Sequence, residues 1–172
     1  MSAAANRVLM IARIHHRVHS FEGVRTIEFK KFLQDFGREF SAMSSSDTCN
    51  GKVSVEGSQI DLPAVTAIPL GFIANELITN AAKYGKGQIA IRLEPDPEHG
   101  YALSVSNDGP ALPQGFDPCA SRGLGMKIVR SFIDQIGGEL RIERGADGQG
   151  ARFTVLFSAA VVQPLSPNAA TS

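Results

Sequence analysis

The order of helical and strand-like segments is the feature that most limits how this chain can fold. Apolar residues recur at helical spacing in four segments, and apolar–polar alternation marks six short segments typical of strands. The predicted helices span residues 3–20, 28–43, 64–84 and 123–136, and the predicted strands span residues 52–56, 59–62, 88–94, 101–106, 139–143 and 151–157. This order requires both hairpins and parallel crossovers, which predicts an α+β fold: one mixed sheet covered by helices on one face. It excludes a doubly wound fold.

Short turn sequences separate the predicted strands. The Gly-Ser pair at residues 57–58 predicts a hairpin between the first two strands. Residues 95–100 and 145–150 are rich in Gly, Pro and Asp and predict two further turns. The apolar spacing predicts which residues of the second and fourth helices face the core: Phe29, Phe32, Leu33, Phe36 and Phe40 in one, and Ile128, Val129, Phe132 and Ile136 in the other.

Composition narrows the class of protein. A chain of 172 residues that is 43% hydrophobic predicts one globular domain with some appended chain. Its 17 basic and 17 acidic residues cancel, so neither nucleic acid nor an anionic membrane is an expected partner. Cys49 and Cys119 lack metal-ligand spacing and are interpreted as free thiols in a reducing cytosol. With no apolar run of membrane-spanning length, we expect a cytoplasmic protein, or the soluble portion of a longer one.

The third predicted helix carries two rows of side chains. Its apolar stripe consists of Leu70, Ile73, Ala74, Leu77, Ala81 and Tyr84. Beside it lie Glu76, Asn80 and Lys83, spaced four and three residues apart and therefore neighbours on the helix surface. A carboxylate, an amide oxygen and an ammonium could hold a metal-bridged phosphate. A solvated helix flank is the alternative, and this helix alone favours it.

Two glycine-containing segments are further candidates. Asn107, Asp108 and Gly109 follow a strand and could let the backbone approach a ligand, although Asn-Asp-Gly is also ordinary turn chemistry. Gly123-Leu124-Gly125 precedes a helix whose first N–H groups suit a phosphate, with a flexible hinge as the alternative. The spacing matches neither a P-loop nor a dinucleotide-binding fingerprint.

These segments together resemble a known family. The blocks PLGFIANELITNAAKYG, NDG, GLGMKIV and QIGGEL occur in this order between residues 69 and 140. Their order and spacing resemble the ATP-binding domain of the GHKL superfamily, which includes gyrase, MutL, the ninety-kilodalton heat-shock chaperone and histidine kinases. Histidine kinases of the HWE and second HisKA types are the most similar group. The resemblance covers about residues 51–157 and implies a Bergerat-type two-layer α/β sandwich.

The resemblance implies ATP and Mg²⁺ as cofactors. Asn80 matches the asparagine that ligates the Mg²⁺ bridging the nucleotide phosphates, and Glu76 matches the carboxylate that polarises the attacking group or orients a metal-bound water. Lys83 is similar to a phosphate contact, and Tyr84 to an aromatic that packs near the nucleotide. The second glycine box, whose N–H groups hold phosphate, corresponds to Gly123, Leu124, Gly125 and Met126.

The chain departs from the family pattern at the adenine end of the pocket. The family's first glycine box is Asp-x-Gly-x-Gly, and alignment on Gly109 places Asn107 at the aspartate and Ala111 at the second glycine. Asn107 can still accept a hydrogen bond through its amide oxygen, or Asp108 can take that role. The family's Gly-Thr pair is Gly150-Ala151 here, so one polar contact is missing.

The position of the phosphoacceptor histidine is open. His16, in the sequence His15-His16-Arg17-Val18, resembles the H-R-V box of such kinases. The preferred alignment instead makes residues 6–20 the end of the second helix of a dimerisation hairpin, which places the acceptor upstream. His15 and His19 as a metal-binding pair are a third alternative, without further ligands nearby.

The resemblance implies a histidine kinase catalytic domain in a two-component signalling system. Residues 1–22 are the predicted end of the helical hairpin, 23–50 a linker and first helix, 51–158 the ATP-binding domain and 159–172 a disordered tail. The γ-phosphoryl group of Mg·ATP would pass to a histidine and then to the receiver domain of a response regulator, with homodimerisation through the N-terminal helices. A degenerate adaptor with weak ATP binding and an anti-sigma-factor serine kinase are the alternatives.

Overall fold

A computed structural model describes residues 8, 12, 16, 26–44, 52–84, 87–110, 123–145 and 148–159. Val8, Ala12 and His16 are helical, in agreement with the predicted N-terminal helix. The rest of residues 1–22, residues 111–122 and the tail beyond Ala159 lie outside the described residues.

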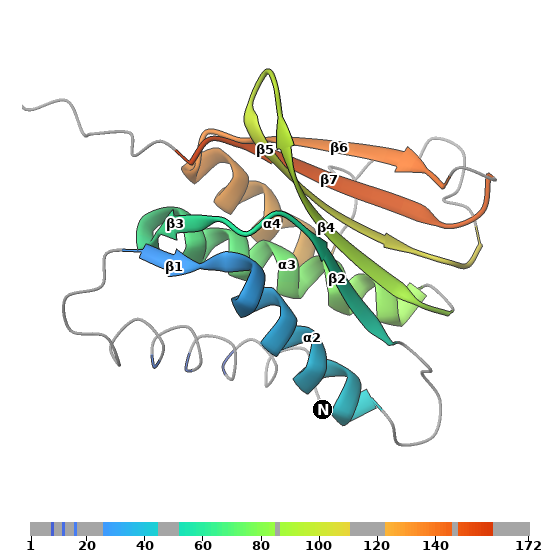
Figure 1. The fold of residues 1–172 in the computed structure, drawn as a ribbon. Helices are drawn as coiled ribbons and strands as arrows, with labels where there is room; N and C mark the ends of the chain where they lie inside the picture. Colours follow the sequence, from blue (N-terminus) through green and yellow to red (C-terminus); the bar gives the residue numbers. More distant parts are fainter. Residues whose placement is uncertain are drawn as a thin grey trace, which may run out of the picture.

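One mixed five-stranded sheet forms the frame of the fold (Figure 1). Its strands, in spatial order, are β2 (Val53–Gly57), β4 (Ile89–Asp96), β5 (Gly100–Asn107), β7 (Ala151–Phe157) and β6 (Glu139–Arg144). The pair β2–β4 is parallel and the other three pairs are antiparallel. The predicted mixed sheet is therefore confirmed. The strand β4 continues two residues further than expected, so the turn that follows it is shorter than residues 95–100.

The predicted hairpin at residues 57–58 is wrong. The strand β3 (Asp61–Pro63) pairs with β1 (Thr26–Glu28) in a separate two-stranded sheet, whereas β2 pairs with β4. Gly57 has φ 110°, and a Cβ there would lie 2.0 Å from the carbonyl oxygen of Leu93. The chain thus leaves the large sheet after Gly57, where Ser58 N–H donates to that same oxygen at 2.7 Å. A glycine followed by serine indicated a turn but not which strand would be the partner.

Three helices cover the same side of the sheet: α2 (Phe29–Ser44), α3 (Ala64–Tyr84) and α4 (Leu124–Gln135) (Figure 1). All three agree with the predicted helices to within a residue or so at each end. In α3, Pro69 lies in the second turn, where it has no N–H to donate to the Val65 carbonyl, and the helix continues through it to Tyr84. No helix in the described parts of the chain is long and apolar enough to cross a membrane.

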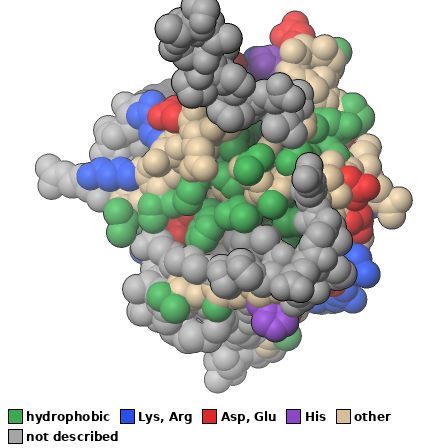
Figure 2. Space-filling view, turned by 90° about the vertical axis from the view of Figure 1, so that its left-hand side faces the viewer, with side chains coloured by type: hydrophobic (Ala, Val, Ile, Leu, Met, Phe, Trp, Pro, Cys, Tyr) green, Lys and Arg blue, Asp and Glu red, His purple; other side chains and the backbone are tan. Residues whose placement is uncertain are grey.

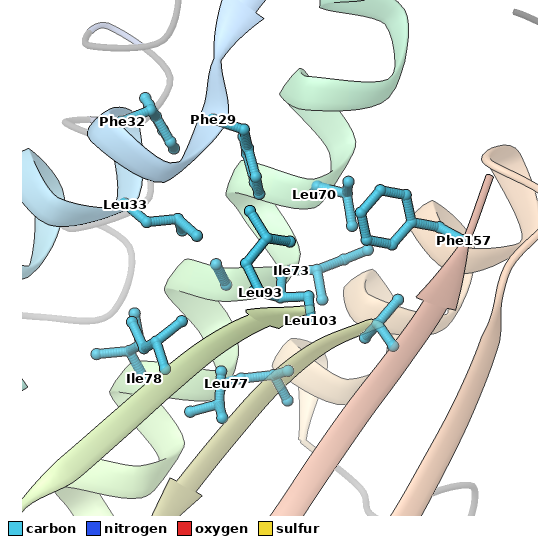
Figure 3. Packing of buried hydrophobic residues seen from close by; sticks show 14 of the residues in the cluster. Phe29, Phe32, Leu33, Leu70, Ile73, Leu77, Ile78, Leu93, Leu103 and Phe157 are labelled. Atoms are coloured by element: carbon cyan, nitrogen blue, oxygen red, sulfur yellow. The ribbon is translucent and has the colours of Figure 1, made fainter. Parts of the chain in front are cut away.

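The core lies between the sheet and the helices. Leu33 of α2, Ile73 of α3 and Leu103 of β5 are fully buried in it and point toward one another (Figure 3). Each such side chain contributes about 1.5–3 kcal/mol through burial. The predicted face of α2 is confirmed: four of its five residues are buried and Phe40 is half-buried.

The helices α3 and α4 pack directly on each other. The rings of Phe72 and Phe132 stack with centroids 5.1 Å apart and 14° between their planes. In α4 the predicted residue Val129 is buried and its predicted companions are half-buried, while Met126 and Ile133 are also buried, which the prediction did not include. The buried face of α4 thus begins in its first turn.

Candidate functional site

The polar row on α3 runs from the protein interior to the solvent. Glu76 is only 5% exposed, Asn80 is half-buried and Lys83 is exposed. A buried carboxylate is costly to desolvate and is retained only with compensating contacts, so it is not a feature of a solvated flank. The interpretation of this row as a solvated flank is therefore wrong for Glu76.

The predicted apolar stripe of α3 ends before Tyr84. The four stripe residues from Leu70 to Leu77 are buried and Ala81 is half-buried, but Tyr84 is 68% exposed. The Nζ atom of Lys83 lies 5.0 Å from the centre of the Tyr84 ring, within the range of a cation–π contact. The prediction that Tyr84 belongs to the core stripe is wrong. Its ring lies at the surface, next to a cation.

One hydrogen bond joins the candidate residues of α3 and α4. The Nδ2 atom of Asn80 donates to the Sδ atom of Met126 at 3.7 Å. Met126 lies in the first turn of α4 and is 5% exposed. The amide oxygen Oδ1 of Asn80 has no hydrogen-bond partner among the described residues. The structure thus brings two predicted site residues, 46 positions apart in the chain, into direct contact.

The N-terminus of α4 has no side-chain cap. Gly123 is the N-cap residue, with φ −72° and ψ 134°, and no acidic residue lies in the first turn. Leu124, the first helical residue, is 61% exposed. The first N–H groups of the helix have no intrahelical acceptor, and the helix dipole favours a negative charge there. This helix end therefore has N–H donors that a phosphate needs, and the Asn80 amide oxygen on the neighbouring α3 is an acceptor that could ligate a cation.

The segment Asn107–Gly109 lies where β5 ends, as predicted. Asp108 N–H donates to the carbonyl oxygen of Gln88 at 3.4 Å, and Gly150 N–H donates to that of Gly109 at 2.7 Å. The Nδ2 atom of Asn107 donates to the carbonyl oxygen of Asp108 at 3.2 Å. Since its amide nitrogen is engaged locally, the oxygen of the Asn107 side chain is the part that remains to accept a further hydrogen bond.

Two glycines allow the close packing around this segment. A Cβ at Gly150 would lie 2.1 Å from the carbonyl oxygen of Asn107, and a Cβ at Gly87 would lie 3.2 Å from the Cβ of Asp108. Gly150 belongs to the family motif named above, whereas no packing role was predicted for Gly87. The contact of Gly87 with Asp108 was missed, since no sequence pattern relates the end of α3 to the end of β5.

The two departures from the family pattern face each other. Asn107 and Ala151 are direct partners in the register of β5 and β7. Ala151 is 5% exposed and offers no side-chain hydrogen bond at this position. The third departure, Ala111, lies outside the described residues. The polar groups at this end of the sheet are therefore supplied by Asn107 and Asp108.

A separate ionic cluster lies at the opposite end of β5. The Asp96 carboxylate accepts a hydrogen bond at 2.9 Å from Nδ1 of His99, which lowers the pKa of Asp96 below its usual 3.8. Arg141 donates to Glu139 at 2.8 Å, which lowers the pKa of Glu139 and raises that of Arg141. These groups are near Gly100, whereas the candidate site is near Asn107, so they take no part in it.

The described surface has no strong charge bias on the face seen in Figure 2. Apolar side chains gather near the middle of that face, with both acidic and basic side chains around them. No group of three or more His, Cys, Asp or Glu residues within the described ranges could hold a metal ion. Mg²⁺ commonly binds through one or two protein oxygens plus substrate phosphates and waters, and Oδ1 of Asn80, which lacks a partner in the described part of the chain, fits that pattern.

The chain matches a family model over residues 66–161, described as histidine kinase-, DNA gyrase B- and HSP90-like ATPase. It is 30% identical over 118 residues to blue-light-activated histidine kinase 2 of Erythrobacter litoralis, covering 65% of this chain and 34% of that protein. It is 32% identical over 108 residues to the signal transduction histidine-protein kinase/phosphatase MprB of a Mycobacterium species, covering 53% of this chain and 21% of that protein. The chain thus spans about a third or less of the length of these relatives.

Solved structures share the fold. The histidine kinase domain of the Erythrobacter litoralis EL346 blue-light-activated histidine kinase matches with a TM-score of 0.73 and 21% identity, over 92% of this chain and 76% of that one. The ATP-binding domain of PrrB from Mycobacterium tuberculosis matches with a TM-score of 0.64 and 16% identity, over 78% of this chain and 96% of that one.

Proposed function

Because the chain belongs to the histidine kinase-, DNA gyrase B- and HSP90-like ATPase family, we propose that it is the catalytic and ATP-binding domain of a protein-histidine kinase. Its reaction is the transfer of the γ-phosphoryl group of Mg·ATP to a histidine imidazole. The phosphoryl group then passes to an aspartate in the receiver domain of a response regulator. The named kinases among its relatives support this proposal.

The contact between Asn80 and Met126 is the observation that carries the proposal. It brings the Asn80 side chain on α3 next to the first turn of α4, which supports a site where the Asn80 oxygen and the N–H groups of α4 engage one polyphosphate. Bound Mg²⁺ would neutralise phosphate charge and link those oxygens to Oδ1 of Asn80. The backbone N–H groups of residues 124–126 then hold phosphate oxygens, in a site preorganised by two packed helices.

The other residues of the row have roles that follow from their burial. Glu76, buried one turn before Asn80, orients the attacking imidazole or a water on the metal. Lys83 is exposed, so its ammonium group stays hydrated in the absence of nucleotide and can reach a bound phosphate. The exposed ring of Tyr84 packs near the nucleotide and also holds the ammonium of Lys83.

The adenine base lies at the end of β5. The side-chain oxygen of Asn107 accepts a hydrogen bond from the adenine amino group, with Asp108 as the alternative acceptor, and Gly109 keeps the backbone open to the base. An amide oxygen carries no full charge and is a weaker acceptor than a carboxylate, so the base contributes less affinity here than an aspartate would provide. Phosphate and metal contacts therefore dominate binding.

The acceptor histidine and the partners lie beyond the described site. We place the acceptor on a segment outside this chain, with His16, which is exposed and helical, as the candidate within it. The N-terminal helix would contribute to a homodimer, and the domain would work in the cytoplasm, where ATP and the response regulator are available. Residues 51–158 make up the ATP-binding domain of this proposal.

Calorimetric titration with a non-hydrolysable ATP analogue tests the proposal. We expect binding that strengthens when Mg²⁺ is added, and an Asn80→Ala variant that no longer gains affinity from Mg²⁺. Glu94→Gln, an exposed change elsewhere on the sheet, should behave as the wild type. Absence of measurable binding by the wild type, with or without Mg²⁺, would rule the enzymatic function out and favour a degenerate adaptor.

A further inference from the structure

The hydrogen bond between Asn80 and Met126 assigns a role to the Met126 side chain, which supplies no polar group of its own to the ligand. We infer that Met126 is a positioning residue: its sulfur fixes the orientation of the Asn80 side-chain amide and thereby sets how strongly nucleotide binding responds to Mg²⁺. This inference rests on the proposed function for the metal and adds to it a second helix that controls the metal-binding oxygen.

The chemistry of the contact selects one orientation of the amide. A thioether sulfur has no hydrogen to donate and can only accept, so it pairs with the NH₂ end of the Asn80 side chain. The distance between Nδ2 and Sδ is 3.7 Å, within the range for a sulfur acceptor. Rotation of the amide by half a turn would place its oxygen against the sulfur, where two acceptors would face each other. The contact therefore turns Oδ1 away from Met126.

The sulfur is held in place by the core. Met126 is 5% exposed and lies on the same buried face of α4 as Val129 and Ile133. Methionine has three rotatable bonds, but a side chain packed on several sides cannot follow a moving partner. Asn80, by contrast, is half-buried, and its amide would be free to rotate without this partner. The fixed group therefore orients the movable one.

The same contact links the two phosphate-binding elements of the proposed site. Met126 belongs to the first turn of α4, whose N–H groups are the proposed phosphate donors. Asn80 belongs to α3 and supplies the proposed metal ligand. A triphosphate that engages both must match the distance between α3 and α4, to which the Phe72–Phe132 stack and the Asn80–Met126 contact both contribute. Loss of the sulfur should weaken the metal contribution and leave the contribution of α4 in place.

The variant Met126→Leu tests the inference. It conserves side-chain volume, which cores tolerate best, and removes only the acceptor. The measured quantity is the ratio of the affinities for a non-hydrolysable ATP analogue with and without Mg²⁺. We expect this ratio to fall about tenfold, as for other groups that orient a metal ligand, because the substitution removes the sulfur and keeps the backbone N–H of residue 126. Ile133→Leu, a buried change on the same helix away from Asn80, is the matched control and should leave both values unchanged.

A second readout is independent of nucleotide binding. The ¹H–¹⁵N signals of the Asn80 side-chain amide, identified by their loss in Asn80→Ala, should shift in Met126→Leu and remain in place in Ile133→Leu. Three results would each overturn the inference: an unchanged Mg²⁺ ratio, an equal loss of affinity with and without Mg²⁺, or unmoved side-chain signals. If the wild type bound no nucleotide, the proposed function would fail, and the amide signals alone would decide whether Met126 orients Asn80.

Discussion

In the proposed site, single residues at the end of β5 decide how the adenine base is held. Asn107 presents a neutral oxygen, while its nitrogen is engaged with the Asp108 carbonyl. Replacement Asn107→Asp supplies a charged acceptor, which makes stronger hydrogen bonds, and should raise the affinity for the ATP analogue by about tenfold. The comparison variant is Asp108→Asn, which should change little. If Asp108→Asn lost affinity and Asn107→Asp gained none, Asp108 would be the base-binding residue instead. Calorimetry of both variants measures this.

Glu76 is the buried ionisable residue of the site, and its charge is proposed to act in phosphoryl transfer. Glu76→Gln keeps the volume and removes the charge, so the affinity for Mg·ATP should stay near that of the wild type. The phosphotransfer rate should fall by about a hundredfold, the lower range for a positioned acid or base. Labelled ATP in a single-turnover assay, with a matching acceptor histidine supplied, measures the rate. An unchanged rate would show that the carboxylate has a structural role only.

The Asp96–His99 contact makes a pH-dependent contribution to stability at the other end of the sheet. Because the hydrogen bond from His99 lowers the pKa of Asp96, the carboxylate stabilises the fold above its unfolded pKa of 3.8. That stabilisation is lost as the pH falls through the lower pKa of the folded state. Asp96→Asn should therefore melt at a lower temperature than the wild type near neutral pH, and this difference should vanish in acid. A difference in Tm that persisted at pH 2 would contradict this account.

At the scale of elements, the glycine turn before β7 packs against the end of β5, where the proposed site holds the adenine base. Gly150 has φ 71° and no room for a Cβ, which would lie 2.1 Å from the Asn107 carbonyl oxygen. Gly148 has the same φ of 71° but nothing within 4 Å of its Cβ position. Gly148→Ala should thus cost only the backbone strain, about 1–2 kcal/mol, and leave nucleotide binding intact.

Gly150→Ala should reduce the free energy of unfolding by more than Gly148→Ala does, because the added Cβ also forces the ends of β5 and β7 apart. It should also lower the affinity for the nucleotide by displacing Asn107. Urea denaturation of both variants, together with calorimetry, separates the strain from the clash. Equal losses of stability in the two variants would show that the close approach of Gly150 to Asn107 has no energetic weight.

The elements also show what periodicity can predict. The helical spacing of five apolar residues in α2 was sufficient to predict its buried face, because residues three or four apart lie on the same face of a helix. The partner strands of β2 and β3, which are β4 and β1, were not predictable in this way. Strand alternation marks a face, whereas the choice of partner depends on residues far away in the chain, such as Leu93, whose carbonyl oxygen accepts from Ser58.

At the scale of the whole molecule, the sequence predicted the mixed sheet, the helices on one face and the family. It could not predict that Glu76 is buried or that Tyr84 is exposed, since both depend on how α3 packs against the sheet and α4. It also named Asn80 and Met126 separately, without their contact. The amide–sulfur hydrogen bond depends on how α3 packs against α4, which no local pattern in either segment encodes.

The central claim is that α3, the end of β5 and the start of α4 form one Mg·ATP site. Titration of the ¹⁵N-labelled chain with a non-hydrolysable ATP analogue and Mg²⁺ tests it most directly. We predict that backbone amide signals shift at residues 76–84, 107–109 and 123–126, and that those of the Asp96–His99 turn remain unchanged. Shifts confined to that turn or to β6, or the absence of shifts at saturating nucleotide, would contradict the account.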